Sequence, residues 1–349
     1  MRSFEFESFE EAYPELLKAL LEEGEIVAPR GQITREITPF CFTIRNPRKA
    51  IYHNPLRKAN YGFMVAELLW MLRGSNNLEE IAHYNSQWSN FTDNVITLTG
   101  AYGNRIYNYQ SCVLQKDENG NENYVPMLVN QFEMAFQQLK KDPDTRQATI
   151  VLFNPAMDYT ETKDKPCTNL MRFMIRGGKL NMLTFMRSND VILGLYPYDF
   201  FNFVHFQAVM ASKLGIEMGK YTHIVDSFHI YEKHFELAQQ IIDNPYQTPS
   251  LYDENTITNL IPSDQVDIEL ARVQNIEALT RRIGNIVDLK KVENLLNNIQ
   301  SNYWRSLAAI VAIYNIRKAK RSQEDIDYLK PIIVNELKNI VNDLKTLTK

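Results

Sequence analysis

The sequence predicts an α+β protein that ends in a helical extension. Two Met- and Phe-rich segments, 169–176 and 179–187, are separated by a Gly-Gly pair, which is a good hairpin signal. Residues 60–72 carry apolar side chains at the three- and four-residue spacing of a helix. The same helical spacing recurs through most of residues 267–349.

The other elements follow from local periodicity and from the residues that end helices. Apolar residues three or four apart indicate helices, and short apolar runs bounded by turn residues indicate strands. Gly74, Asp142-Pro143 and Gly215 each stand where a helix should stop. In chain order we expect a helix at 9–22, β structure at 32–44, helices at 60–72 and 128–141, a strand at 148–153, the hairpin, a helix at 200–214, a strand at 221–231 and a helix to about residue 243.

A change of composition divides the chain into two predicted domains. Residues 244–265 are rich in Pro, Ser, Thr and Asn, which indicates a linker or an irregular return. We therefore expect one domain at 1–265 and a helical extension at 266–349. From residue 267 onward, 14 Lys/Arg stand against 10 Asp/Glu, and a solvated helix face explains this excess better than an acidic partner does.

Composition argues against several classes of protein. The hydrophobic fraction of 44% and the charged fraction of 23% are globular values, and a net charge of −4 disfavours direct nucleic-acid binding. A small anion held by a few arginines stays compatible with that charge. The start has no signal-peptide core, and the longest apolar stretch, 306–316, is too short to span a bilayer. Three cysteines without a CxxC pair fit reduced thiols, so we expect a cytoplasmic protein without membrane attachment.

Cys167 is the first candidate for chemistry. If the two glycines form the hairpin turn, Cys167 faces Ser188 and Thr168 faces Arg187. A nearby cation favours the thiolate and lowers the pKa of the thiol, which would make Cys167 a nucleophile. The alternative is a small buried side chain, which is what most free cysteines are.

Two carboxyl groups stand in unusual places. The helical neighbours three and four positions from Glu67 are all apolar, so burial should raise its pKa and suit it to proton transfer. The alternative is a glutamate at a helix end that pairs with one arginine. Asp199 directly precedes the helix expected at 200–214, and capping that helix is its default role.

The histidines do not predict a metal site. His223, His229 and His234 are six and five residues apart, so no two of them share one helical face. No cysteine pair joins them. We therefore expect no metal.

These residues together resemble the thymidylate synthase family, which includes pyrimidine hydroxymethylases. The resemblance covers roughly residues 20–245, and several motifs in family order are far more specific than any one alone. It implies a mixed sheet with flanking helices and a homodimer formed through that sheet. The motifs are Glu67-Leu-Leu-Trp-Met-Leu-Arg-Gly, Gly100-Ala-Tyr-Gly, Asp144-Thr-Arg-Gln, Lys165-Pro-Cys-Thr, Arg187-Ser-Asn-Asp-Val-Ile-Leu-Gly-Leu and His229-Ile-Tyr.

The resemblance also implies a role for each matching residue. Cys167 would add to carbon-6 of a pyrimidine nucleotide, so that carbon-5 attacks the methylene of 5,10-methylenetetrahydrofolate. Glu67 would organise water and proton transfers. The other implied contacts are Arg30, Arg187 and Ser188 with the nucleotide phosphate, Arg146 with the same phosphate from a partner subunit, His229 and Tyr231 with the sugar hydroxyl, and Trp88, Asp190 and Tyr198 with the folate.

Three departures from the family pattern matter. The chain reads Pro197-Tyr198-Asp199 where thymidylate synthases read Pro-Phe-Asn, with one extra residue before the proline. A carboxyl group that shares one proton can pair with the amino group and ring nitrogen of cytosine, and in the family this Asp goes with deoxycytidylate hydroxymethylases. Arg146 is followed by Gln147 in place of a second arginine, which weakens one phosphate contact. A helical extension replaces the short tail that closes the site.

The resemblance therefore implies 5-hydroxymethylation of dCMP, with Cys167, Glu67 and Asp199 at the reacting base. Water would complete the reaction. One alternative is methyl transfer to give thymidylate or 5-methyl-dCMP with dihydrofolate as coproduct, because Trp88 holds the position that shields the reaction from water in the synthases. A second alternative is a nucleotide-binding or regulatory protein without catalysis, against which the intact Cys167, Glu67 and Arg187 argue.

Overall fold

The computed structural model describes residues 2–245, 261–334 and 337–342 of the chain. Its centre is an eight-stranded mixed sheet in the order β1-β4-β10-β9-β8-β7, with β3 and β2 continuing from β10. Pairs β1/β4 and β9/β10 are parallel, and the others are antiparallel. This confirms the α+β prediction. The strands are β1 Arg2–Phe6, β2 Glu25–Val27, β3 Thr34–Ile37, β4 Phe40–Ile44, β7 Thr149–Val151, β8 Thr168–Arg176, β9 Lys179–Asp190 and β10 Glu217–Tyr231.

The β8–β9 hairpin forms at the predicted turn but changes register near Cys167. Gly177 and Gly178 have φ values of 59° and 73°, which glycine adopts without strain. The predicted pairing holds from Arg176↔Lys179 to Leu170↔Phe185, and then shifts by one residue. Thr168 pairs with Met186, so the prediction that it faces Arg187 is wrong.

The cause of this shift is a β-bulge between Thr168 and Leu170. The carbonyl of Asn169 accepts from Leu152 and Phe153 at 2.8 and 3.3 Å, on the side of β7, instead of pairing with β9. The Cys167 carbonyl consequently accepts from the Arg187 amide at 2.8 Å, so Cys167 lies opposite Arg187 and not Ser188.

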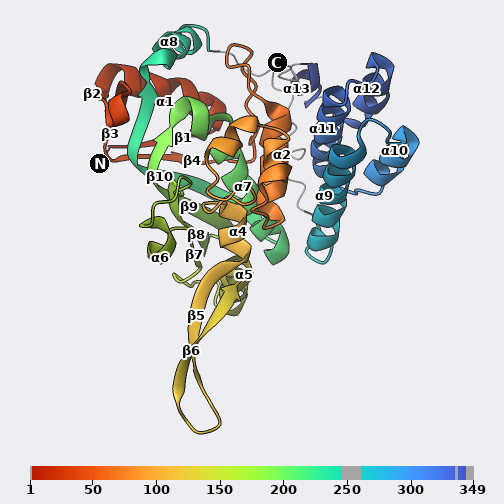
Figure 1. Cartoon of the computed structure of the whole chain (residues 1–349). Helices are drawn as coiled ribbons and strands as arrows, with labels where there is room; N and C mark the ends of the chain where they lie inside the picture. The colour runs from red at the N-terminus through yellow and green to blue at the C-terminus, as the bar shows by residue number, and fades with distance from the viewer. Residues whose placement is uncertain (1, 246–260, 335–336, 343–349) are drawn as a thin grey trace.

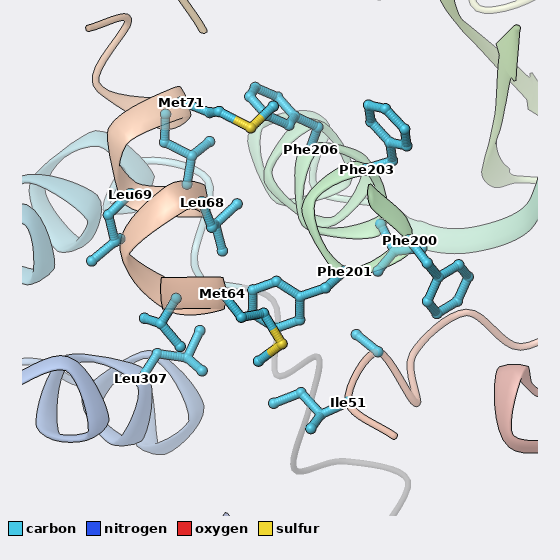
Figure 2. Packing of buried hydrophobic residues seen from close by; sticks show 14 of the residues in the cluster. Ile51, Met64, Leu68, Leu69, Met71, Phe200, Phe201, Phe203, Phe206 and Leu307 are labelled. Carbon is cyan, nitrogen blue, oxygen red and sulfur yellow. The ribbon is translucent and has the colours of Figure 1, made fainter. Parts of the chain in front are cut away.

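The helices occur where apolar periodicity predicts them. Helices α1 (Phe9–Glu23), α2 (Tyr61–Leu72) and α7 (Phe200–Leu214) match the predicted ranges to within one residue. Every residue of α2 is buried, because it lies between α7 and the C-terminal helices (Figure 2). Helix α5 (Gln131–Lys141) starts three residues later than predicted, because 128–129 belong to a strand. The other elements are η1 Pro29–Gly31, α3 Leu78–Ala82, η2 Ser86–Asn90, α4 Tyr102–Tyr107, α6 Pro155–Asp158, η3 Val191–Asp199, η4 Glu232–His234 and α8 Phe235–Asp243.

A two-stranded arm, which the sequence did not predict, projects from the body (Figure 1). It consists of β5 (Tyr109–Lys116) and β6 (Glu122–Val129), paired only with each other. Most of its side chains are exposed. The arm therefore adds little to the core that positions the site.

The C-terminal extension is helical, as predicted, and it packs beside α2 (Figure 1). Its elements are α9 Val266–Ile283, α10 Leu289–Asn297, α11 Asn302–Lys318, α12 Gln323–Leu329, η5 Lys330–Ile332 and α13 Lys338–Asn342. Leu307 of α11 lies beneath the α2 side chains in Figure 2. A cluster of buried hydrophobic residues runs without a break through the sheet, α2 and α11. The predicted linker falls mostly outside the described residues, and the boundary at 265/266 stays a prediction.

A buried ion-pair network ties the extension to the rest of the chain. Glu277 of α9 accepts from Arg73 at 2.7 Å, from Arg281 at 2.7 Å and from the Tyr84 hydroxyl at 2.8 Å. Burial works to raise the pKa of Glu277, but the two guanidinium groups outweigh it and the pKa is lowered. Such a carboxylate depends on its partners to remain charged. Among the described helices, none combines the length and apolar character needed to cross a membrane.

Candidate active site

The site lies where the parallel strands β9 and β10 end side by side. The register pairs Ser188 with Ser227, and Asp190 with His229. Carboxyl ends of adjacent parallel strands commonly form ligand sites in sheets covered by helices. Cys167, which directly precedes β8, also lies at this end of the sheet.

Backbone contacts hold the segment that carries Cys167. The hydroxyl oxygen of Tyr102 accepts from the amides of Cys167 and Thr168, both at 3.2 Å. The Arg187 guanidinium donates to the carbonyls of Pro166 at 3.0 Å and Lys165 at 3.1 Å. Arg187 therefore secures the cysteine segment as well as supplying charge beside it.

The pKa of the Cys167 thiol is raised, which contradicts the predicted direction. Burial raises it, Arg187 opposes that effect, Asp199 and Asp164 raise it further, and Arg30 lowers it. The cation predicted beside the thiol is present, but desolvation outweighs it. Cys167 as a whole residue is half-buried.

Glu67 is buried on α2 and is 9% exposed. Its Oε2 accepts from Asn202 Nδ2 of α7 at 2.8 Å. Burial, and next the charge of Asp199, raise its pKa to about 8. Within the described part of the chain no arginine pairs with Glu67, so the alternative of a helix-end ion pair is wrong. The prediction of a carboxyl group with a raised pKa is confirmed.

Asp199 does not act as a capping residue. It has helical dihedral angles, its side chain makes no capping hydrogen bond, and the backbone of η3 runs directly into α7. Its Oδ2 instead accepts from Asn189 Nδ2 at 2.6 Å. Burial raises the pKa of Asp199 to about 6, although the hydrogen bond from Asn189 works to lower it.

The segment that contains Pro197 is π-helical, η3. Tyr196 leaves helical geometry there, and its buried ring lies 4.8 Å from that of Tyr13 and 5.3 Å from that of Tyr52. Its hydroxyl donates to the Tyr52 carbonyl at 2.8 Å. Tyr196 thus belongs to a buried aromatic cluster, and Asp199 directly precedes α7.

The residues predicted to hold an anion come from separate segments. Arg30 has a φ of 55° and is exposed, and like Arg187 it acts electrostatically on Cys167. Ser188 directly follows Arg187 at the end of β9. Arg146 is exposed before β7, and its carbonyl accepts from Arg172 Nη2 at 2.6 Å. Arg30, Arg187 and Ser188 therefore belong to this end of the sheet, and Arg146 lies beside its β7–β8 edge.

The residues predicted for the sugar are neighbours on β10. The rings of His229 and Tyr231 lie 5.4 Å apart, edge to face. The Nδ1 of His229 lies 3.2 Å from the carbonyl of Ser227. His229 pairs with Asp190 across the two strands, so a residue predicted for the sugar and one predicted for the folate lie at the same end of the sheet.

The residues predicted for the folate include a free acceptor. Asp190 Oδ1 accepts from the amides of Ile192 and Leu193 at 2.7 and 2.6 Å, while Oδ2 is buried and has no hydrogen-bond partner among the described residues. The Tyr198 ring meets Phe63 edge to face at 4.8 Å. Trp88 in η2 is half-buried, 6.2 Å from the ring of Trp70.

Residues 11–283 match the family model of thymidylate synthase. The chain belongs to the thymidylate synthase family. A curated relative, the deoxyuridylate hydroxymethyltransferase of Bacillus phage SP01, is 34% identical over 221 residues. That alignment covers 63% of this chain and 56% of the relative, so it spans little more than half of the relative's length. The family match reaches into α9, beyond the boundary predicted at residue 265.

Two site residues of this thymidylate synthase family member were missed by reasoning from sequence. Tyr102 was quoted only as part of Gly100-Ala-Tyr-Gly, and Asn189 only as part of the stretch after Arg187. Nothing local in the sequence shows that Tyr102 meets Cys167, or that Asn189 meets Asp199. Within the described residues, no group of three or more His, Cys, Asp and Glu side chains is placed to hold a metal.

Proposed function

We propose that the chain hydroxymethylates carbon-5 of deoxycytidylate, with 5,10-methylenetetrahydrofolate as the one-carbon donor. The observation that carries the proposal is that Asp199 is freed from capping and lies within electrostatic reach of both Cys167 and Glu67. A nucleophile, a protonatable carboxyl group and a base-reading carboxyl group therefore share one site.

Cys167 begins the reaction. Its Sγ forms a bond to carbon-6 of the pyrimidine, and the electrons of the 5,6 double bond make carbon-5 nucleophilic. The thiol must first lose its proton, which its raised pKa opposes. Arg187 and Arg30 are the cations that favour the thiolate at that step.

Glu67 moves protons near the base. A pKa of about 8 keeps it largely protonated at neutral pH, so it can donate a proton and later accept one. Asn202 holds one of its oxygens and leaves the other for water or substrate. Carbon-5 would take up the one-carbon unit and lose its proton while the folate nitrogen departs, which leaves an exocyclic methylene group on the substrate. Water would add to that methylene carbon with loss of a proton, and re-formation of the 5,6 double bond would then expel the Cys167 thiolate from carbon-6.

The nucleotide phosphate would be held by Arg30, Arg187 and Ser188, because guanidinium groups bind such oxygens in a bidentate manner. His229 and Tyr231 would bind the sugar hydroxyl. Gln147 would contribute little charge.

We propose that the enzyme is a homodimer through its sheet, with Arg146 completing the partner's phosphate site. Residues of β8, β9 and β10 alternate between buried and half-buried along each strand. The half-buried side chains include Leu170, Met174, Leu183, Phe185 and Ile224, an apolar set unusual for an exposed sheet face. Arg172 projects on this same face and holds the backbone of Arg146.

The folate-facing residues fit the cofactor. The unpartnered, buried Oδ2 of Asp190 suits the N–H donors of a pterin, and Trp88 and Tyr198 offer aromatic surface. When bound, methylenetetrahydrofolate supplies the one-carbon unit at the oxidation level of formaldehyde. The three free cysteines suit a reducing compartment, so we place the reaction in the cytoplasm.

Two specific observations favour related reactions that differ in the base or in the group transferred. The relative from phage SP01 is named for deoxyuridylate, which favours uracil as the base. Trp88 favours methyl transfer, because at this position it would shield the reacting carbon from water. The same relative's name favours a hydroxymethyl product.

One experiment separates these reactions. The enzyme is incubated with methylenetetrahydrofolate and, in turn, dCMP, CMP or dUMP, and the product masses are measured. A gain of CH2O by dCMP supports the proposal, and a gain of CH2 indicates methylation. Turnover of dUMP alone refutes the cytosine assignment, and Cys167→Ser is the control that should form no product.

A further inference from the structure

A chain of buried polar side chains ends on the carboxyl group of Asp199. Asn189 donates to Asp199 at 2.6 Å through Nδ2, and its Oδ1 lies 3.2 Å from His223 Nε2. His223 Nδ1 lies 2.8 Å from the Tyr221 hydroxyl and 3.1 Å from that of Thr184. Asn189, His223, Tyr221 and Thr184 are all buried. The mechanism above uses none of these four.

When Asp199 is ionised, the hydrogen bonds that link these side chains can run in one donor-to-acceptor direction only. A carboxylate oxygen only accepts, so Asn189 must present its N–H to Asp199 and its carbonyl to His223. That carbonyl also only accepts, so His223 carries its proton on Nε2. Its Nδ1 is then an acceptor for the hydroxyl of Tyr221 or Thr184.

Gly194 closes the other side of the Asn189–Asp199 pair. A Cβ at Gly194 would lie 2.7 Å from Asn189 Nδ2 and 2.9 Å from Asp199 Oδ2. Real Cβ atoms do not approach so closely, so any larger residue here would have to displace the Asn189 amide or the Asp199 carboxyl group. The amide and the carboxyl group are thus held together from both sides.

The direction of the chain matters for base choice. With Oδ2 held as an acceptor, only Oδ1 of Asp199 can carry a proton. Cytosine presents an amino donor beside a ring-nitrogen acceptor, and uracil presents the reverse order. If the proton of the carboxylic acid can sit on either oxygen, the acid can pair with both bases. If the proton is confined to one oxygen, the acid can pair with only one order of donor and acceptor on the base.

We propose that Asn189, oriented by His223 and the two hydroxyl groups, is a positioning residue that sets pyrimidine specificity by fixing which oxygen of Asp199 accepts. The inference rests on the proposed function only in that Asp199 meets the base. It does not depend on which base the wild type prefers.

The test compares dCMP with dUMP in two variants of the full-length protein. Asn189→Leu removes the donor to Asp199 at similar size. The double variant Tyr221→Phe/Thr184→Val removes both hydroxyls, so that His223 can shift its proton to Nδ1 and the Asn189 amide can reverse. Dissociation constants are measured by calorimetry for each nucleotide, with kcat and KM for each wherever turnover occurs.

We expect the ratio of the two dissociation constants to move toward one by about tenfold in both variants. The double variant is the stricter test, because it changes no atom beside Asp199. Tyr13→Phe is the matched control: in the part of the chain that the structure describes, the buried Tyr13 hydroxyl has no hydrogen-bond partner, so its removal should leave the ratio unchanged.

The outcomes separate this inference from the proposed function. A wild type that prefers dUMP refutes the cytosine assignment, yet a ratio that collapses in the variants still supports the role of Asn189. Equal weakening of both nucleotides, with the ratio preserved, shows a merely structural role and overturns the inference. If Asn189→Leu does not fold, the ratio in the double variant decides by itself.

Discussion

Replacing Glu67 with glutamine should stabilise the protein while abolishing turnover. Burial on α2 leaves Glu67 9% exposed, and burial together with the charge of Asp199 raises its pKa to about 8 from an ordinary 4.5. Glutamine keeps an oxygen for Asn202 Nδ2, which donates to Glu67 at 2.8 Å, but it has no charge to bury. The substitution therefore separates the chemistry of the carboxyl group from its packing.

The size of the effect follows from linkage between protonation and folding. A raised folded-state pKa means that the folded protein binds the proton more tightly than the unfolded chain does. This stabilisation is complete below the unfolded pKa of 4.5 and is lost as pH rises through about 8. Each pKa unit is worth about 1.4 kcal/mol, so the ionisable carboxyl group costs about 3 kcal/mol of stability at pH 7 relative to a neutral group.

Urea unfolding followed by circular dichroism, repeated between pH 5 and pH 8.5, measures this effect. Glu67→Gln should differ least from the wild type at pH 5, by about 1 kcal/mol, and gain stability steadily toward pH 8. Glu118→Gln, in the exposed turn of the arm, is the matched control and should show no pH-dependent gain. A Glu67→Gln variant that is less stable than the wild type at pH 8, or whose gain does not change with pH, would refute the reasoning.

Three further predictions concern single side chains. Cys167→Ser should lose turnover but keep nucleotide binding by calorimetry, because the thiolate acts only in the covalent step; near-normal rates would contradict the mechanism. Asp199→Asn should shift the ratio of kcat/KM from dCMP toward dUMP by ~1–3 kcal/mol, and an unchanged ratio would refute the role of Asp199 in base choice. Glu277→Gln should destabilise the protein by about 1.5–3 kcal/mol at neutral pH, because Arg73 and Arg281 lose their short ion pairs with Glu277 and keep only the longer ones with Glu80, at 3.9 and 3.4 Å. Since the pKa of Glu277 is lowered, the wild type keeps this stability above the unfolded pKa and loses it as pH falls through the folded pKa, so the two unfolding curves should converge in acid.

Local patterns in the sequence predicted what depends on neighbours along the chain. Helix α7 spans Phe200–Leu214 and ends at Gly215 with a φ of 69°, as the apolar spacing and the glycine indicate. The hairpin turns at Gly177-Gly178 for a similar reason. The turn needs positive φ angles, and the ease with which glycine adopts them depends on the residue type alone. The order and spacing of the motifs were enough to recognise the family, because both can be read directly from the sequence.

The details of the site depend on contacts between segments far apart in the chain. The bulge at Asn169 shifts the pairing of β8 with β9 by one residue, so that Cys167 lies opposite Arg187 and not Ser188. The wrong pKa direction for Cys167 has a similar origin, because a sequence shows the nearby cation but not how much apolar surface removes water from the thiol.

The sequence by itself therefore determined the order of the central elements and the helical extension, although not the β5–β6 arm. Only the tertiary structure decided that Asp199 is freed from capping, that Tyr196 is absorbed into an aromatic cluster and that Asn189 holds the Asp199 carboxyl group. The physical reason is that dihedral preferences are local, whereas desolvation and hydrogen-bond direction depend on every side chain that folding brings near.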